Sequence, residues 1–135
     1  MKVEFLPDLT DGGKYKQVVS EQLVRLYDFD YKEAIKFGQQ LQKRIVDEHL
    51  PLDITALAFI EPINCKLIFA ISEADEGITT ENGFSFICNL TTVAYKHMIY
   101  LLEPFCDKNY NGSGYQWLYD LDTPIDLLFS PGGTW

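Results

Sequence analysis

The sequence predicts a single α+β domain over residues 1–135, in which two N-terminal helices pack on an antiparallel β-meander, with a later helix and a short C-terminal helix. Three observations predict this class. Apolar residues in the first fifty positions recur at helical spacing, whereas short apolar runs separated by turn residues follow them. A chain of 135 residues, 47% of them hydrophobic, can also bury one core. Helices grouped ahead of strands are typical of α+β proteins.

The first predicted helix follows a short strand or arm, Val3–Leu6, which ends at Pro7. Its apolar face repeats every three or four residues, the period of an α-helix. The positions on this face are Tyr15, Val18, Val19, Gln22, Leu23, Leu26 and Tyr27. We therefore expect a helix that ends near Tyr27.

The second predicted helix covers Tyr31–His49 and stops before Pro51. Asp30 and Glu33 have the spacing of a capping box, in which each side chain satisfies free backbone N–H groups at a helix start. Because only three residues separate the two helices, they are expected to form an antiparallel pair.

Three predicted strands follow the helices. The runs Asp53–Ile60 and Lys66–Ser72 are interrupted by a turn-like break and predict a hairpin. Phe84–Thr91 alternates in polarity and favours a third antiparallel strand, which completes a meander. Between the last two lies an acidic loop, Glu73–Gly83, which ends in the tight-turn pair Asn82-Gly83.

The C-terminal third contains two further predicted helices. Thr92–Phe105 mixes helical and strand signals, and we favour a helix that ends before Pro104. In the sequence Asp122-Thr123-Pro124, a capping side chain precedes a proline at a first helical position. A short helix over Pro124–Phe129, capped by Asp122, is therefore expected.

The net charge of −9 disfavours nucleic acids and anionic membranes as partners. The charge is uneven. Residues 1–50 hold eight bases and nine acids, whereas residues 51–135 hold three bases and eleven acids, giving −1 and −8. Such a field steers a cationic partner to the second part, although a solubility-giving acidic surface has the same composition.

The sequence contains no recognised catalytic, metal or cofactor motif. Its three cysteines lack Cys-x-x-Cys spacing and indicate reduced residues of a soluble cytoplasmic protein, and no apolar run is long enough for a signal peptide or a membrane span. The two histidines and scattered cysteines do not have the spacing of zinc ligands. An enzyme stays an alternative only if folding joins His97, Cys106 and a carboxylate in one deep pocket.

The remaining signal is recognition, concentrated in Tyr115–Trp135, which mixes aromatic and acidic residues and has no Lys or Arg. Tyr and Trp give large contact area at low entropic cost, and carboxylates pair with basic side chains. The candidate partner-binding residues are Glu73, Asp75, Glu76, Glu81, Trp117, Tyr119, Asp120, Asp122 and Asp126. The alternative is that the apolar members pack on the sheet while the acids cap helices and face water.

The run Trp-Leu-Tyr-Asp-Leu-Asp-Thr-Pro-Ile-Asp-Leu-Leu, within residues 114–135 of a small acidic α+β protein, resembles immunity proteins of bacterial toxin systems, particularly those of contact-dependent growth inhibition. The resemblance implies a cytoplasmic, non-enzymatic inhibitor, monomeric or weakly dimeric. Its implied partner is the C-terminal domain of a cognate toxin, a basic and often nuclease-type protein, whose active site or substrate surface it occludes. The alternative is an acidic chaperone or adaptor that dimerises through an exposed edge of the meander and holds a secreted or assembling protein.

Overall fold

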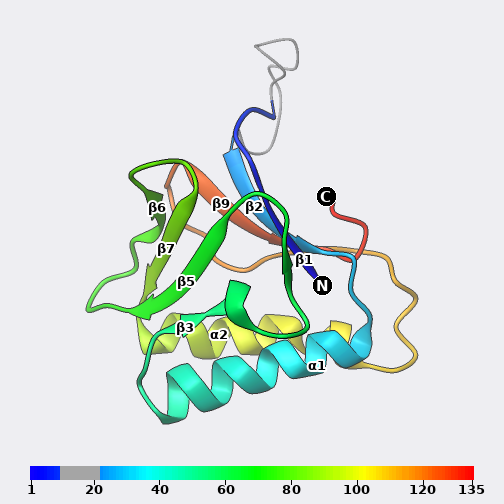
Figure 1. Cartoon of the computed structure of the whole chain (residues 1–135). Coiled ribbons are helices and arrows are strands. Elements are labelled where there is room, and N and C mark those ends of the chain that lie inside the picture. The colour runs from blue at the N-terminus through cyan, green and yellow to red at the C-terminus, as the bar shows by residue number, and fades with distance from the viewer. Residues whose placement is uncertain (10–21) are drawn as a thin grey trace.

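The computed structural model describes residues 1–9 and 22–135 and places them in two mixed β-sheets and two main helices (Figure 1). The first sheet has the strand order β4 (Glu61–Pro62), β1 (Lys2–Leu6), β2 (Gln22–Tyr27), β9 (Ile125–Phe129), β8 (Gln116–Trp117). The second has the order β3 (Leu52–Asp53), β5 (Lys66–Ile71), β7 (Ser85–Leu90), β6 (Gly77–Thr80). The predicted arrangement of two N-terminal helices on a meander is therefore wrong, because the described chain is rich in strands.

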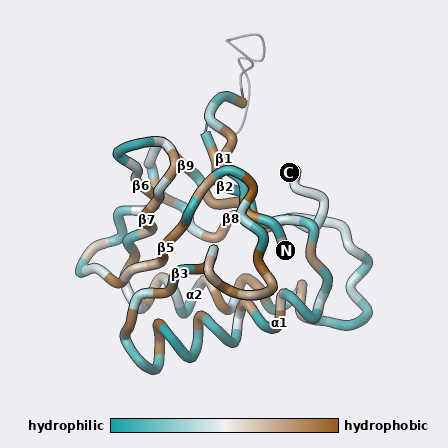
Figure 2. The backbone as a smooth tube through the Cα atoms, viewed as in Figure 1, coloured by the Kyte–Doolittle hydropathy of each residue, from teal (hydrophilic) through white to brown (hydrophobic). Residues whose placement is uncertain are grey.

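The two helices lie side by side beneath the sheets in Figure 1. Helix α1 (Tyr31–Gln40) continues as a π-helical segment, Leu41–Asp47, and α2 (Thr92–Leu102) continues as a 3-10 turn, Glu103–Cys106. Figure 2 shows hydrophilic residues along the outer side of α1, as expected for an amphipathic helix at the surface. No helix in the described ranges is long and apolar enough to cross a bilayer.

Aromatic side chains join both sheets and both helices in one core. Phe37 of α1 is fully buried and lies 5.9 Å from Phe129 of the first sheet and 6.2 Å from Phe69 of the second, measured between ring centroids. Phe69 in turn lies 5.6 Å from Tyr95 of α2. Because one ring contacts both sheets, burial of Phe37 holds the layers together.

The prediction of a helix ending at Tyr27 is wrong for the part that the structure describes. Residues 15–21 lie outside the described residues, and Gln22–Tyr27 form β2. This strand is central, antiparallel to β1 and parallel to β9, and its residues Leu23, Val24 and Leu26 are fully buried. Leu23 on one face of this strand and Val24 and Leu26 on the other are all buried, so its apolar residues do not alternate strictly and also fit a helical period.

The prediction of a helix over Tyr31–His49 is confirmed for Tyr31–Asp47, although its last turns are π-helical. Asp30 caps the helix by accepting a hydrogen bond from the Glu33 amide at 3.0 Å. The Glu33 carboxylate instead binds the Met1 ammonium at 2.5 Å. Only half of the predicted capping box therefore forms, because a cation is a stronger partner for a carboxylate than an amide is.

The strand predicted over Asp53–Ile60 is wrong beyond its first residue. Asp53 accepts a hydrogen bond from the Thr55 amide at 3.1 Å and starts a 3-10 turn, Ile54–Ala56, so that β3 is only two residues long. The antiparallel meander is also wrong. β3 and β5 are antiparallel as expected, but β5 and β7, which match the other two predicted strands, are parallel.

The segment predicted as an acidic loop contains strand β6, which pairs antiparallel with β7 and makes the parallel pairing of β5 and β7 possible. The turn at Asn82-Gly83 is confirmed. The Asn82 side chain accepts hydrogen bonds from the amides of Phe84 at 2.9 Å and Ser85 at 2.8 Å, and Gly83 has φ 73°. Glycine suits this position because it adopts a positive φ without steric cost.

The later helix is confirmed as α2, and Thr91 caps it by accepting from the Ala94 amide at 3.2 Å. The C-terminal helix over Pro124–Phe129 is wrong, because Ile125–Phe129 form β9 between β2 and β8. Four of its five residues are buried, as a central strand requires. Asp122 therefore caps no helix, contrary to prediction.

Candidate functional site

A hollow of about 730 Å³ opens where α2, β8, β9 and the loop between these two strands meet. Helix α2 contributes two residues one turn apart, and β8 contributes both of its residues. The loop between β8 and β9 contributes most of the lining, and β9 adds the carboxylate of Asp126. The lining residues are His97, Leu101, Gln116, Trp117, Tyr119, Asp120, Leu121, Asp122, Thr123, Pro124 and Asp126. Five of the nine predicted partner-binding residues thus line one hollow: Trp117, Tyr119, Asp120, Asp122 and Asp126.

Strand pairing sets the wall of the hollow. Trp117 of β8 lies opposite Leu128 of β9, and Asp126 is two residues before Leu128. Residues two apart on a strand share a face, so the Trp117 ring and the Asp126 carboxylate project from the same face of the first sheet. An aromatic wall and a half-buried carboxylate are thereby held on adjacent strands.

Tyr119 anchors the loop that supplies most of the lining of the hollow. The residue is 8% exposed, and its hydroxyl accepts a hydrogen bond from the Ile78 amide at 3.2 Å and donates to the Ile125 carbonyl. Ile78 belongs to the second sheet and Ile125 to the first, so one side chain ties the sheets together. Burial raises the pKa of Tyr119 above its usual value. The hydroxyl is therefore engaged inside the protein, and only the ring remains for a ligand.

The rim of the hollow is acidic and unpaired. Asp120 and Asp122 are exposed and Asp126 is half-buried. Within the described part of the chain, none of these three carboxylates takes part in a hydrogen bond or an ion pair. The lining contains no Lys or Arg, and His97 is its one ionisable base. Such a rim attracts a cationic group and offers it several acceptors.

A smaller hollow of about 210 Å³ adjoins the first and shares His97, Tyr119, Asp120 and Leu121 with it. Asp75 lies on its wall, and its carboxylate accepts a hydrogen bond from the Thr91 amide at 2.8 Å, just before α2 begins. Asp75 therefore orients the start of α2 as well as adding negative charge beside Asp120.

The other three acidic candidates lie outside both hollows. Glu73 and Glu76 are exposed residues between β5 and β6. Glu81 follows the end of β6 opposite to the end near Asp75, beside the turn at Asn82-Gly83. These carboxylates contribute to the field of the molecule but not to the lining.

The arrangement needed for a cysteine nucleophile is not present in the hollow. Cys106 is absent from the residues that line it, and its thiol donates to the Leu102 carbonyl at 3.4 Å. Burial raises the pKa of the Cys106 thiol, which disfavours the reactive thiolate. Among residues 1–9 and 22–135, no group of three or more His, Cys, Asp and Glu side chains is placed to hold a metal ion.

From the sequence, His97 is a candidate only as a partner of Cys106 and Leu101 is not a candidate, although both line the hollow. His97 and Leu101 are four positions apart and therefore share one face of α2, which the helical prediction for this segment implies. Nothing in the local sequence indicates that this face meets the loop after β8. Gln116, Thr123 and Pro124 lie beside predicted candidates and carry no signal of their own.

No protein-family model, curated protein or solved structure matches this chain.

Proposed function

We propose that the protein is an immunity protein, which binds the basic C-terminal domain of a cognate toxin through the hollow beside β8 and occludes the active site or substrate surface of that domain in the cytoplasm. The observation that carries the proposal is the rim of Asp120, Asp122 and Asp126, three carboxylates without a partner among the described residues, around a hollow with an aromatic wall and no Lys or Arg in its lining. These carboxylates take the places of phosphates in a nuclease site.

Charge explains how such a complex would form. The net charge of −9 and the uneven distribution of acids create a field that speeds association with a cationic surface, and dissolved salt weakens this field. The association rate constant should therefore fall as ionic strength rises. Apolar lining such as Trp117 and Leu121 excludes water around the ion pairs and strengthens them.

The test uses a cognate toxin domain, if the neighbouring reading frame encodes one. Its binding to the full chain is measured by surface plasmon resonance, and rescue from toxicity by co-expression. We expect the triple variant Asp120→Asn, Asp122→Asn, Asp126→Asn to lower the association rate constant and to lose rescue. Glu48→Gln is the single-charge control, because Glu48 is an exposed acid directly after the π-helical segment Leu41–Asp47. Unchanged affinity and rescue in the triple variant contradict the proposal.

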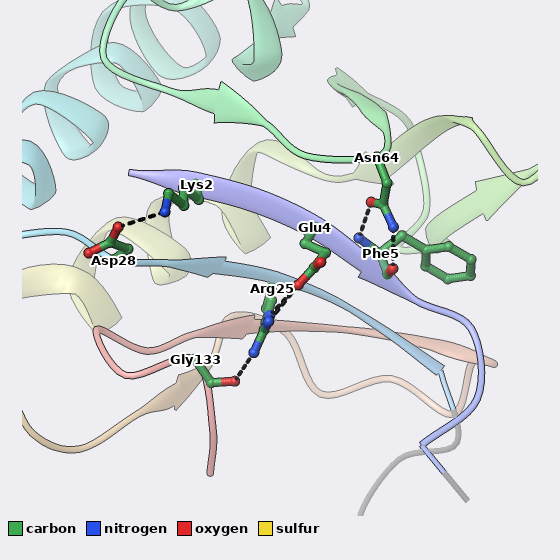
Figure 3. A network of polar contacts seen from close by, with 7 residues as sticks. All are labelled: Lys2, Glu4, Phe5, Arg25, Asp28, Asn64 and Gly133. Carbon is green, nitrogen blue, oxygen red and sulfur yellow. Dashed lines mark hydrogen bonds and ion pairs between the residues drawn. The ribbon is translucent and has the colours of Figure 1, made fainter. Parts of the chain in front are cut away.

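The alternative, an acidic chaperone or adaptor that dimerises through a sheet edge, has less support. The outermost strands β3, β4 and β8 have two residues each and β6 has four. Beyond β4, the Asn64 side chain bonds both backbone groups of Phe5 at 2.8 Å, as a neighbouring strand would (Figure 3). Short or blocked edges do not favour pairing between molecules. A dimer that binds unfolded peptide but no folded toxin would favour this alternative.

A further inference from the structure

A row of three aromatic rings extends the wall of the hollow over the surface. The ring centroids of Tyr115 and Trp117 are 6.2 Å apart, and those of Trp117 and Trp135 are 6.0 Å apart. Tyr115 is 48% exposed and Trp135 is 41% exposed. We call these three residues the aromatic row. Large rings that contact one another at the surface offer flat faces to a ligand.

The aromatic row and the acidic rim belong to one surface, because Trp117 is a member of both. Asp126 projects from the same face of the first sheet as Trp117, as the register of β8 and β9 requires. A cation that enters the hollow therefore meets aromatic faces and carboxylate acceptors together. Arginine is the side chain that uses both, since its planar guanidinium stacks on rings and donates in pairs to carboxylates.

The protein contains this combination elsewhere, fully formed from its own residues. Arg25 lies over the Tyr27 ring, 4.1 Å from its centroid, and donates from Nε and Nη2 to the Glu4 carboxylate at 2.9 and 2.5 Å. Its Nη1 donates to the Gly133 carbonyl at 3.0 Å. Figure 3 shows the guanidinium between the Glu4 carboxylate and the Gly133 carbonyl. The hollow has the Trp117 ring and the rim carboxylates, but no arginine of this chain is among its lining residues.

We propose that the hollow takes an arginine side chain of the toxin domain, with its guanidinium stacked on Trp117 and donating to the rim carboxylates. The inference rests on the proposed function and names the residue of the partner that is recognised. Lysine fits less well, because its ammonium is strongly hydrated, is a point charge, and cannot stack as a plane. Arginine-bearing segments are therefore preferred over lysine-bearing segments of equal charge.

The test compares three probes on the full chain: a peptide of six arginines, one of six lysines, and one of six citrullines, which keeps the planar shape without charge. Binding is followed by tryptophan fluorescence and by ¹⁵N shifts that include the indole N–H groups. At low ionic strength the arginine peptide should bind roughly two- to fivefold more tightly than the lysine peptide, the factor expected for an exposed cation–π contact. The citrulline peptide should not bind measurably.

Substitutions then test whether the preference for the arginine peptide arises at the hollow. Trp117→Leu should bring the arginine peptide to the affinity of the lysine peptide, and Asp122→Asn should weaken both peptides alike. Glu48→Gln is the control that loses one charge outside the hollow. If Trp117→Leu does not fold, Trp117→Phe keeps a ring of similar shape that binds cations less well, and it should lessen the arginine preference.

Two results overturn the inference. One is equal affinity for the arginine and lysine peptides, and the other is an arginine preference whose shifts lie away from Trp117 and which survives its substitution. Either leaves the proposed function intact if the toxin still binds and rescue still depends on the three carboxylates. Conversely, a toxin that binds unchanged to the triple Asn variant overturns the proposed function whatever the peptides do.

Discussion

Tyr119 shows how one side chain can serve the fold and the hollow together. Its hydroxyl bonds to backbone groups of both sheets, and the residue lines the hollow. The Gly77 backbone packs against the Tyr119 ring, and a Cβ atom there would lie 3.3 Å from two ring atoms. The loop that carries Asp120 and Asp122 is thus held in place by a residue that itself cannot donate to a ligand.

Tyr119→Phe should lower the free energy of unfolding by about 1–3 kcal/mol, because it leaves the Ile78 amide and the Ile125 carbonyl without this partner in a buried position. Urea denaturation measures the change. Tyr100→Phe is the matched control, since Tyr100 is 63% exposed. Equal midpoints for the two variants would mean that the hydroxyl does not link the sheets.

At the scale of elements, β6 decides how the second sheet is arranged. A direct hairpin from β5 to β7 would be antiparallel, but the chain first turns back through β6 on the far side of β7. The connection from β6 into β7 depends on the turn at Asn82-Gly83, with its two amide bonds to the Asn82 side chain. Because this tight turn requires positive φ at one residue, its contribution to the stability of the protein can be measured by a single substitution.

Gly83→Ala should destabilise the protein by roughly 1–2 kcal/mol, the cost of holding an L-residue at positive φ. A Cβ atom at this position would have no atom within 4 Å, so steric contact adds nothing to the effect. Thermal or urea unfolding gives the value. Gly132→Ala is the control, because Gly132 is equally open but lacks positive φ, and it should raise stability by about 0.4–1 kcal/mol. Similar losses at both glycines would contradict the role given to φ.

At the scale of the whole molecule, the C-terminal segment is a structural part of the first sheet. Strand β9 lies between β2 and β8, and Ile125, Leu127, Leu128 and Phe129 are buried. The Phe129 ring also packs against the rings of Phe29, Phe37 and Phe105. The segment that carries the acidic rim therefore cannot be removed without opening the core.

Deletion of residues 125–135 should abolish cooperative unfolding. Burying each large apolar side chain contributes about 1.5–3 kcal/mol, so the loss of four such residues approaches the whole net stability of a typical domain, about 5–15 kcal/mol. Near-UV circular dichroism during urea titration tests this. Deletion of Trp135 alone, an exposed residue, should leave the transition intact. A cooperative transition in the longer deletion would show that β9 is dispensable.

Part of the hollow could be anticipated from the sequence, because Trp117, Tyr119, Asp120, Asp122 and Asp126 are close along the chain and remain close after folding. The roles of two of these residues differ from the prediction. Asp122 caps no helix and has a free carboxylate within the described structure, whereas the hydroxyl of Tyr119 is internally bonded. Glu81 has only its charge in common with these residues, and charge does not indicate at which end of a strand a residue lies.

The amino-acid sequence by itself determined the elements whose signals are local: α1 with its Asp30 cap, α2, the strand cores of β5 and β7, and the turn at Asn82-Gly83. Caps, turns and helical periods act over a few residues, so neighbouring sequence is enough to define them.

Only the tertiary structure decided that Gln22–Tyr27 and Ile125–Phe129 are strands and that β5 and β7 run parallel. The register pairs Gln22 with Ile125, positions at nearly opposite ends of the chain. A central strand is stabilised by hydrogen bonds and packing to such distant partners, and these outweigh a local helical period. The meeting of α2 with the loop after β8, and therefore the hollow itself, arises in the same way.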